Sequence, residues 1–110
     1  MASMEQNKVY DVILETTTVL DLYGIIDYIT EVLKAPESAQ DVYWSIKDQL
    51  LSLGEMPYRF PVVREEPFAS LGVHVMPIEN YNAFYIINEE DREVHVIRVL
   101  YKRREWQNLL

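Results

Sequence analysis

The residues best suited to chemistry lie near the end of the chain, where positive charge and aromatic rings follow the last predicted strand. They are Arg98, Tyr101, Lys102, Arg103, Arg104 and Trp106. Guanidinium groups bind phosphate through paired hydrogen bonds, and an indole ring stacks on a base or on an apolar partner. The pattern could therefore form a binding site for a phosphate-bearing or protein target. Composition alone favours the structural alternative, in which the arginines are simply solvated and Trp106 fills the core.

The rest of the chain is acidic, which limits what such a site can attract. The formal net charge is −8; residues 1–55 carry three basic and ten acidic side chains, whereas residues 94–110 carry four basic and one acidic. Affinity for nucleic acid comes mainly from cations that neutralise phosphates, so the molecule as a whole is not steered toward it. The sequence predicts a local cationic site on an acidic, well-solvated protein.

Other common kinds of site lack their residues. The absence of cysteine excludes disulfides, thiolate catalysis and cysteine-bound zinc. The three glycines are isolated, so there is no glycine-rich phosphate loop, and His74 and His95 lack the spacing of a zinc site. No serine lies in a nucleophile elbow. We therefore expect neither metal nor cofactor, and both histidines are more readily explained as structural residues than as residues that line a site.

The length points to a single domain. A chain of 110 residues buries about 65% of the surface that it exposes when unfolded. No apolar run approaches the ~20 residues of a membrane span, and no signal-peptide pattern opens the chain, so we expect a cytoplasmic protein without membrane contact. We assign residues 1–110 to one domain and expect residues 1–7 to be flexible. Met1-Ala2-Ser3, ahead of Met4, is consistent with a cloning remnant.

Two helices should follow an opening strand over Lys8–Leu14. Thr16, Thr17 or Thr18 can cap the first helix, and Pro36 separates it from the second because a proline disfavours helical geometry in the residue before it. Gly54 suits a left-handed cap at the end of the second helix. The short link predicts an antiparallel hairpin. The apolar stripes repeat every three or four residues: Val19, Leu22, Ile25, Ile26, Ile29 and Leu33, then Ala39, Val42, Tyr43, Ile46, Leu50 and Leu53.

Three strands should end the chain after a proline-rich loop over Glu55–Pro67. They are predicted over Leu71–Pro77, Tyr81–Asn88 and Glu93–Tyr101. Both faces of the last strand are largely apolar, which predicts a central position in the sheet. The order of one strand, two helices and an antiparallel meander is an α+β layout.

Several motifs together resemble the RelE/ParE superfamily of toxins from bacterial type II toxin-antitoxin modules. They are Leu71-Gly72, Asn80-Tyr81-x-x-Phe84-Tyr85, Arg98-Val99-Leu100-Tyr101-x-Arg103-Arg104-x-Trp106 with a closing Leu109-Leu110, Asp21-Leu22, Ile25-x-x-Tyr28-Ile29 and Pro36-x-x-Ala39. The resemblance covers nearly the whole chain and implies the same α+β fold. It also implies a growth-inhibiting toxin, neutralised by a cognate antitoxin that wraps over the sheet and hairpin. The acidic hairpin would suit a basic antitoxin segment.

One branch of this superfamily, RelE-like toxins, is implied to cut messenger RNA on the ribosome. Such cleavage needs cations around one phosphate and groups that move protons. The candidate catalytic residues are then Arg103, Tyr101 and Arg98. RelE-like patterns commonly have an arginine after the tyrosine of the second meander strand, where this chain has Asn82. Asn82 donates a hydrogen bond but supplies no charge.

The other branch, ParE-like toxins, is implied to poison DNA gyrase by binding it, without catalysis. The segments around Tyr81 and Arg98 resemble this branch more closely, and we favour it. Ribosome-dependent mRNA cleavage is the alternative, and a non-toxic protein-interaction domain of the same fold is a further one. The candidate target-binding residues are Arg103, Arg104, Trp106, Lys102, Tyr81 and Asn82.

Overall fold

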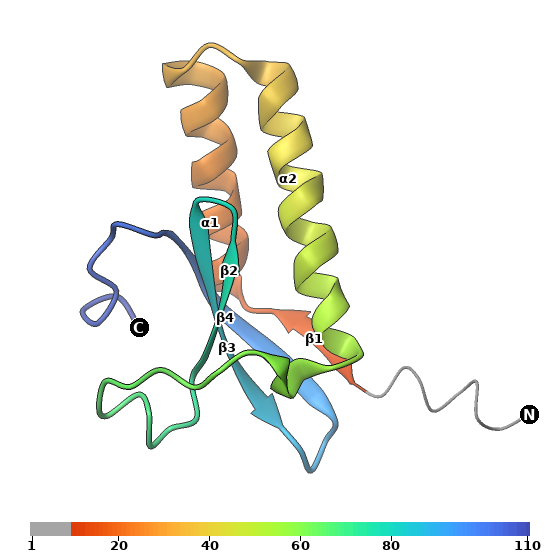
Figure 1. Cartoon of the computed structure of the whole chain (residues 1–110). Coiled ribbons are helices and arrows are strands. Elements are labelled where there is room, and N and C mark those ends of the chain that lie inside the picture. The colour runs from red at the N-terminus through yellow and green to blue at the C-terminus, as the bar shows by residue number, and fades with distance from the viewer. Residues whose placement is uncertain (1–9) are drawn as a thin grey trace, which may run out of the picture.

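The computed structural model describes residues 10–110, which form a four-stranded mixed sheet and a helical hairpin (Figure 1). The strands lie in the order β1-β4-β3-β2, with β1 parallel to β4 and the other pairs antiparallel. The predicted α+β class is confirmed. The elements are β1 (Asp11–Leu14), α1 (Thr16–Asp27), the π-helical turn η2 (Tyr28–Val32), α2 (Pro36–Leu51), the 3-10 helices η3 (Ser52–Gly54) and η4 (Pro57–Arg59), β2 (His74–Ile78), β3 (Tyr81–Asn88) and β4 (Glu93–Tyr101). Predictions for residues 1–9 lie outside the described residues.

The two helices lie side by side and run antiparallel, as predicted (Figure 1). Leu22 and Ile46 from the predicted apolar stripes are buried, whereas Leu33, predicted in the same stripe as Leu22, is exposed. The first helix ends in the π-helical turn, after which Lys34, with a φ of 56°, reverses the chain. Pro36 then opens α2 at its first turn, where a missing N–H costs no helical hydrogen bond.

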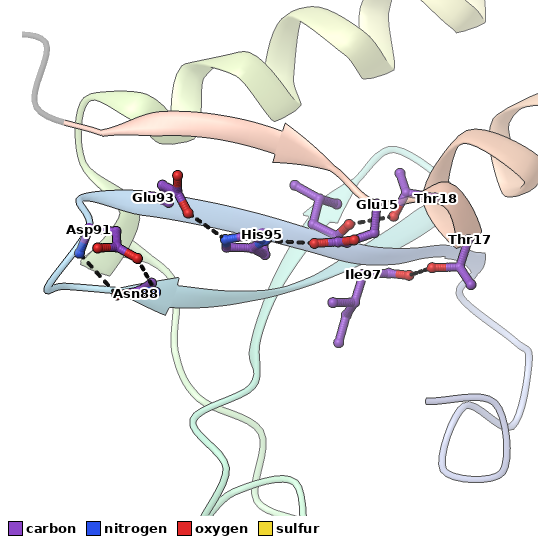
Figure 2. A network of polar contacts seen from close by, with 9 residues as sticks. Glu15, Thr17, Thr18, Asn88, Asp91, Glu93, His95 and Ile97 are labelled. Atoms are coloured by element: carbon purple, nitrogen blue, oxygen red, sulfur yellow. Dashed lines mark hydrogen bonds and ion pairs between the residues drawn. The ribbon is translucent and has the colours of Figure 1, made fainter.

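The predicted threonine cap of the first helix is wrong. The N-cap residue is Glu15, and no side chain caps the helix. The threonine hydroxyls instead donate to the neighbouring strand: Thr18 to the carbonyl of Val96 at 2.7 Å, and Thr17 to that of Ile97 at 2.6 Å (Figure 2). They attach α1 to β4 where β1 ends: the Val96 carbonyl also accepts the Glu15 N–H at 3.0 Å, and Ile97 lies just beyond the last residue of β4 that pairs with β1.

Gly54 does not adopt the predicted left-handed conformation; among the described glycines only Gly72 has a positive φ. It is needed for a different reason. Its carbonyl accepts a hydrogen bond from the Tyr10 N–H at 3.0 Å, and a Cβ at Gly54 would lie 2.8 Å from the Tyr10 carbonyl oxygen. Glycine here lets the end of the hairpin approach the backbone just before β1.

We expect Gly54→Ala to lower the free energy of unfolding by about 1–3 kcal/mol, because the backbone contacts at this point must separate. Urea denaturation followed by circular dichroism measures the change. The matched control is Gly24→Ala in α1, where a Cβ meets nothing within 4 Å and removal of a helical glycine stabilises by up to about 1 kcal/mol. Equal effects at the two glycines would contradict the close-approach argument.

The last strand, β4, is central over half of its length. β1 pairs with residues 93–96 of β4, whereas β3 pairs along the whole strand. The register with β3 shifts so that Val96 faces Tyr85 and Arg98 faces Phe84, which leaves Ile97 as the extra residue of a β-bulge. The prediction that this strand is central is thus confirmed for residues 93–96. The bulge lies just after them, where β1 ends and one edge of β4 has no neighbouring strand. The predicted strand at Leu71 begins later, at His74.

The sheet has an apolar core on each face. The hairpin covers the larger one, which includes Leu22, Leu50, Tyr85 and Val96. The long loop and the C-terminal segment cover the smaller one, built on Val63, Val73, Phe84 and Leu100 with Phe68, Trp106, Leu109 and Leu110 packed against it. None of the helices in residues 10–110 has the length and hydrophobicity of a transmembrane span.

Candidate functional site

The cationic cluster predicted from the sequence forms an exposed turn after β4, which we call the basic turn (Lys102–Arg104). Two backbone hydrogen bonds hold it: the Lys102 N–H donates to the Asn80 carbonyl and the Arg104 N–H to the Tyr101 carbonyl, both at 2.9 Å. Among residues 10–110, none of its three side chains has an acidic partner. Their charge is therefore available to an external anion.

A groove of about 950 Å³ lies beside this turn, between the hairpin and the end of the sheet, and we call it the hairpin groove. Tyr81 and Tyr101 meet edge to face in its wall, with ring centroids 6.1 Å apart. Burial is the main reason that the pKa of Tyr81 is raised, with nearby Tyr101 adding to it. The lining is mostly apolar and comprises Leu20, Asp21, Gly24, Ile25, Tyr28, Ile29, Leu33, Ala35, Ser38, Val42, Glu79, Asn80, Tyr81, Val99, Leu100, Tyr101 and Arg104.

Large apolar side chains along the hairpin groove are left open to solvent. Leu20, Tyr28 and Leu33 are each more than half exposed. Gly24 adds a gap in the wall, since no atom lies within 4 Å of the position of its missing Cβ. Contiguous exposed apolar surface of this kind marks a binding site more often than a solvated face.

The other predicted binding residues lie on the opposite face of the sheet. Asn82 and Trp106 line a smaller hollow of about 310 Å³, together with Phe84 and part of the long loop. The Trp106 ring packs on Phe84 and Phe68, with centroids 5.0 and 5.2 Å away. The indole therefore fills the smaller core, as in the structural alternative, and does not lie with Tyr81, Tyr101 and Arg104.

Arg98 is not free to bind a phosphate, because its guanidinium group already donates hydrogen bonds within the protein. Its Nε and Nη2 donate to the two carboxylate oxygens of Asp21, each at 2.8 Å, and its Nη1 donates to the Leu109 carbonyl at 2.8 Å. The Asp21 carboxylate also accepts the Val99 N–H at 3.0 Å. The hydrogen bonds to Asp21 raise the pKa of Arg98 further. This arginine is permanently charged and already neutralised by a carboxylate.

His95 joins β4 to the start of α1 (Figure 2). Its Nδ1 lies 2.6 Å from Glu15 Oε2, and its Nε2 lies 2.9 Å from Glu93 Oε1. The hydrogen bond to Glu15 and then that to Glu93 raise the pKa of His95 above its ordinary 6.5, against a smaller opposing effect of burial. Protonated His95 can donate to both carboxylates, whereas the neutral ring can donate to only one.

We expect the melting temperature to fall as the pH rises from about 6.5 through the raised pKa of His95. Over this window the folded protein binds more protons than the unfolded chain, so deprotonation costs stability. Differential scanning fluorimetry between pH 6 and pH 9 measures the slope, and His95→Gln should flatten it. Parallel slopes in the two proteins would mean that other groups govern this range.

Sequence reasoning missed three features of the site. The Asp21–Arg98 pair joins residues 77 positions apart, His95 lies 80 positions from Glu15, and the hairpin groove is formed by both ends of the chain. The sequence held a signal for the first of these features. Arg98 lies inside a strand that is apolar on both faces, and a charged side chain in that position requires an anionic partner. Within the described part of the chain, no cluster of three or more histidine, aspartate or glutamate side chains could hold a metal ion.

Known proteins resemble this chain in sequence pattern and in fold. The sequence model of a protein family, the ParE toxin of the type II toxin-antitoxin system, parDE, matches residues 12–106. A comparison with curated protein sequences finds no match.

Solved structures of toxin-antitoxin systems are similar to it. A chain of a chromosomal ParDE system from P. aeruginosa has a TM-score of 0.70 and 21% identity, over 86% of this chain and 97% of that one. A chain of a RelBE toxin-antitoxin complex from Mycobacterium tuberculosis has a TM-score of 0.59 and 22% identity, over 84% and 98%. A chain of the archaeal RelE-RelB complex from Pyrococcus horikoshii has a TM-score of 0.58 and 17% identity, over 87% of this chain and 98% of that one. At these identities the likeness establishes the fold, and the match to the family model over almost all of the sequence establishes the family: the chain belongs to the ParE toxins of type II toxin-antitoxin systems.

Proposed function

We propose that this toxin acts by binding DNA gyrase through the basic turn, and that a cognate antitoxin neutralises it by occupying the hairpin groove. One observation carries the binding role: three exposed cations without an acidic partner in residues 10–110 lie directly beside a groove with exposed apolar walls. Gyrase as the target is inferred from the ParE family. Arginine and aromatic side chains are among the groups that contribute most at protein interfaces. We assign the toxin to the cytoplasm, where it would meet gyrase.

The placement of the candidate catalytic residues supports binding rather than RNA cleavage. Cleavage requires several cations and proton-transferring groups around one phosphate. Arg98 is neutralised by Asp21, and Asn82 lies on the face of the sheet opposite to Tyr101. Arg103 and Tyr101 remain close in sequence, but they lack the second phosphate-binding cation on β3. A toxin that binds its target needs no such assembly.

The hairpin groove suits an antitoxin segment. The similar solved structures are described as toxin-antitoxin systems or complexes, and we extend this kind of partner to the present chain. An amphipathic segment could place apolar side chains against Leu20, Tyr28 and Leu33, while Gly24 allows its backbone to approach closely. Since residues 1–55 carry a net −7, a basic segment would associate at a rate that falls as salt is added.

Two assays on the purified toxin, run in parallel, test the proposed function. One measures gyrase supercoiling of a relaxed plasmid, and the other measures ribosome-dependent cleavage of a messenger RNA. Inhibited supercoiling with intact transcripts is the expected result. Cleavage that Arg103→Ala abolishes would overturn the proposal in favour of the RelE-like alternative. Inactivity in both assays, without growth arrest on induced expression, would favour the non-toxic interaction domain.

A further inference from the structure

Asp21 and Arg98 form a partly buried ion pair, and each side chain also makes a hydrogen bond to the backbone. Their side chains are only 12% and 21% exposed. The pair is bidentate, and each member also bonds to the backbone: Asp21 accepts the Val99 N–H, and Arg98 donates to the Leu109 carbonyl. A planar guanidinium can make these three bonds at once, whereas an ammonium cannot reproduce the bidentate geometry. The pair thus joins α1, β4 and the C-terminal segment at one point.

The C-terminal segment, residues 102–110, has few other attachments. It contains no helix or strand, and it curls back beside the sheet (Figure 1). On the side of β4, the basic turn is held by the two backbone hydrogen bonds from Lys102 and Arg104. On the far side it is held by Trp106, which packs on Phe84 and Phe68 next to a hollow, by the side chains of Leu109 and Leu110 against the smaller core, and by the Leu109 carbonyl. Among the described residues, the hydrogen bond from Arg98 to the Leu109 carbonyl is the one charge-assisted contact that holds residues 105–110.

The β-bulge explains why Arg98 can reach both partners. Arg98 and Phe84 are paired across β4 and β3, and Ile97 is the extra residue that separates Arg98 from the regular alternation of the strand. Arg98 therefore lies beside Phe84, on which Trp106 packs, and also at the free edge of β4, where Asp21 of α1 is within reach. A regular strand would not place one side chain between the helix and the tail.

We propose that Asp21 and Arg98 are positioning residues for target binding: they anchor the C-terminal segment at Leu109 and so hold the basic turn in the conformation that meets the target. This inference rests on the proposed function, because it assigns a role to residues that act through the basic turn. Neither side chain contacts the target. Loss of the pair leaves the three cations in place but makes their conformation more variable, so that binding must first order the turn.

The experiment compares Arg98→Lys and Asp21→Asn with the parent protein in a Trp44→Phe background. Trp106 is then the only tryptophan, since the sequence contains two. Three quantities are measured: acrylamide quenching of Trp106, amide hydrogen exchange of residues 102–110, and the toxin concentration that halves gyrase supercoiling. We expect each variant to raise quenching, to lower exchange protection of the segment about tenfold and to raise the inhibitory concentration about tenfold.

A second variant guards against a general loss of folding. Leu109→Pro leaves Asp21 and Arg98 intact but removes the Leu109 N–H that donates to the Trp106 carbonyl at 2.9 Å. It should loosen the segment and weaken inhibition in the same way. Arg92→Gln, which removes a cation from the β3–β4 turn, is the control and should change none of the three quantities.

Each outcome decides one claim. Variants that leave quenching and exchange unchanged would show that the pair does not anchor the segment. A loosened segment with unchanged inhibition would show that anchoring does not position the basic turn for its target. If the parent protein does not inhibit gyrase, the proposed function fails, and the exchange data still decide whether Asp21 and Arg98 hold the basic turn.

Discussion

The double substitution Arg103→Ala with Arg104→Ala should weaken gyrase inhibition by about 100-fold or more, since each arginine loses charge-assisted hydrogen bonds to the target. Both side chains are exposed, so the fold and its melting temperature should change little. A supercoiling assay over a titration of toxin gives the inhibitory concentration, and circular dichroism checks the fold.

The controls separate charge from geometry. Arg103→Lys with Arg104→Lys keeps the charge but loses the planar fork, and inhibition should fall to an intermediate degree. Arg64→Ala removes an exposed arginine from the long loop and should have no effect. Full inhibition by the double alanine variant would show that gyrase is bound elsewhere on the toxin.

Gly24→Trp should abolish neutralisation by the antitoxin while the toxin itself stays folded and active. The new side chain starts where no atom lies within 4 Å, and it enters the hairpin groove. It therefore occupies the space proposed for the antitoxin segment without disturbing the core. We expect the dissociation constant of the complex to rise by about 100-fold or more, as for a clash at the centre of an interface.

Calorimetric titration of the purified toxin with the antitoxin encoded beside it measures this effect, and co-expression shows whether growth is rescued. The matched control is Tyr23→Trp, one residue earlier on α1, at an exposed position outside the groove lining. It places the same indole ring on a different face of the helix, in exchange for a phenol ring, and should leave affinity unchanged. Tight binding by Gly24→Trp would move the antitoxin away from the hairpin groove.

The fold was largely predictable from the sequence because most of its signals are local. The apolar repeats located both helices, and Pro36 correctly marked the start of α2. The predicted limits of β3 and β4, Tyr81–Asn88 and Glu93–Tyr101, are those of the structure. The errors arose where a residue serves a distant partner. Thr17 and Thr18 bond to β4 and do not cap α1, and Gly54 admits the backbone of Tyr10 and does not form a left-handed cap.

The order of the helices and strands, the family resemblance and the cationic end of β4 could all be predicted from the sequence, because periodicity, proline positions and charge runs act over a few residues. Which of those cations are free depends on contacts between distant segments. Arg98 is neutralised by a carboxylate 77 positions away, and Trp106 is packed into the smaller core, while the basic turn stays exposed beside the hairpin groove. Such outcomes depend on the β-bulge and on how α1 crosses the free edge of β4, and no local pattern encodes either.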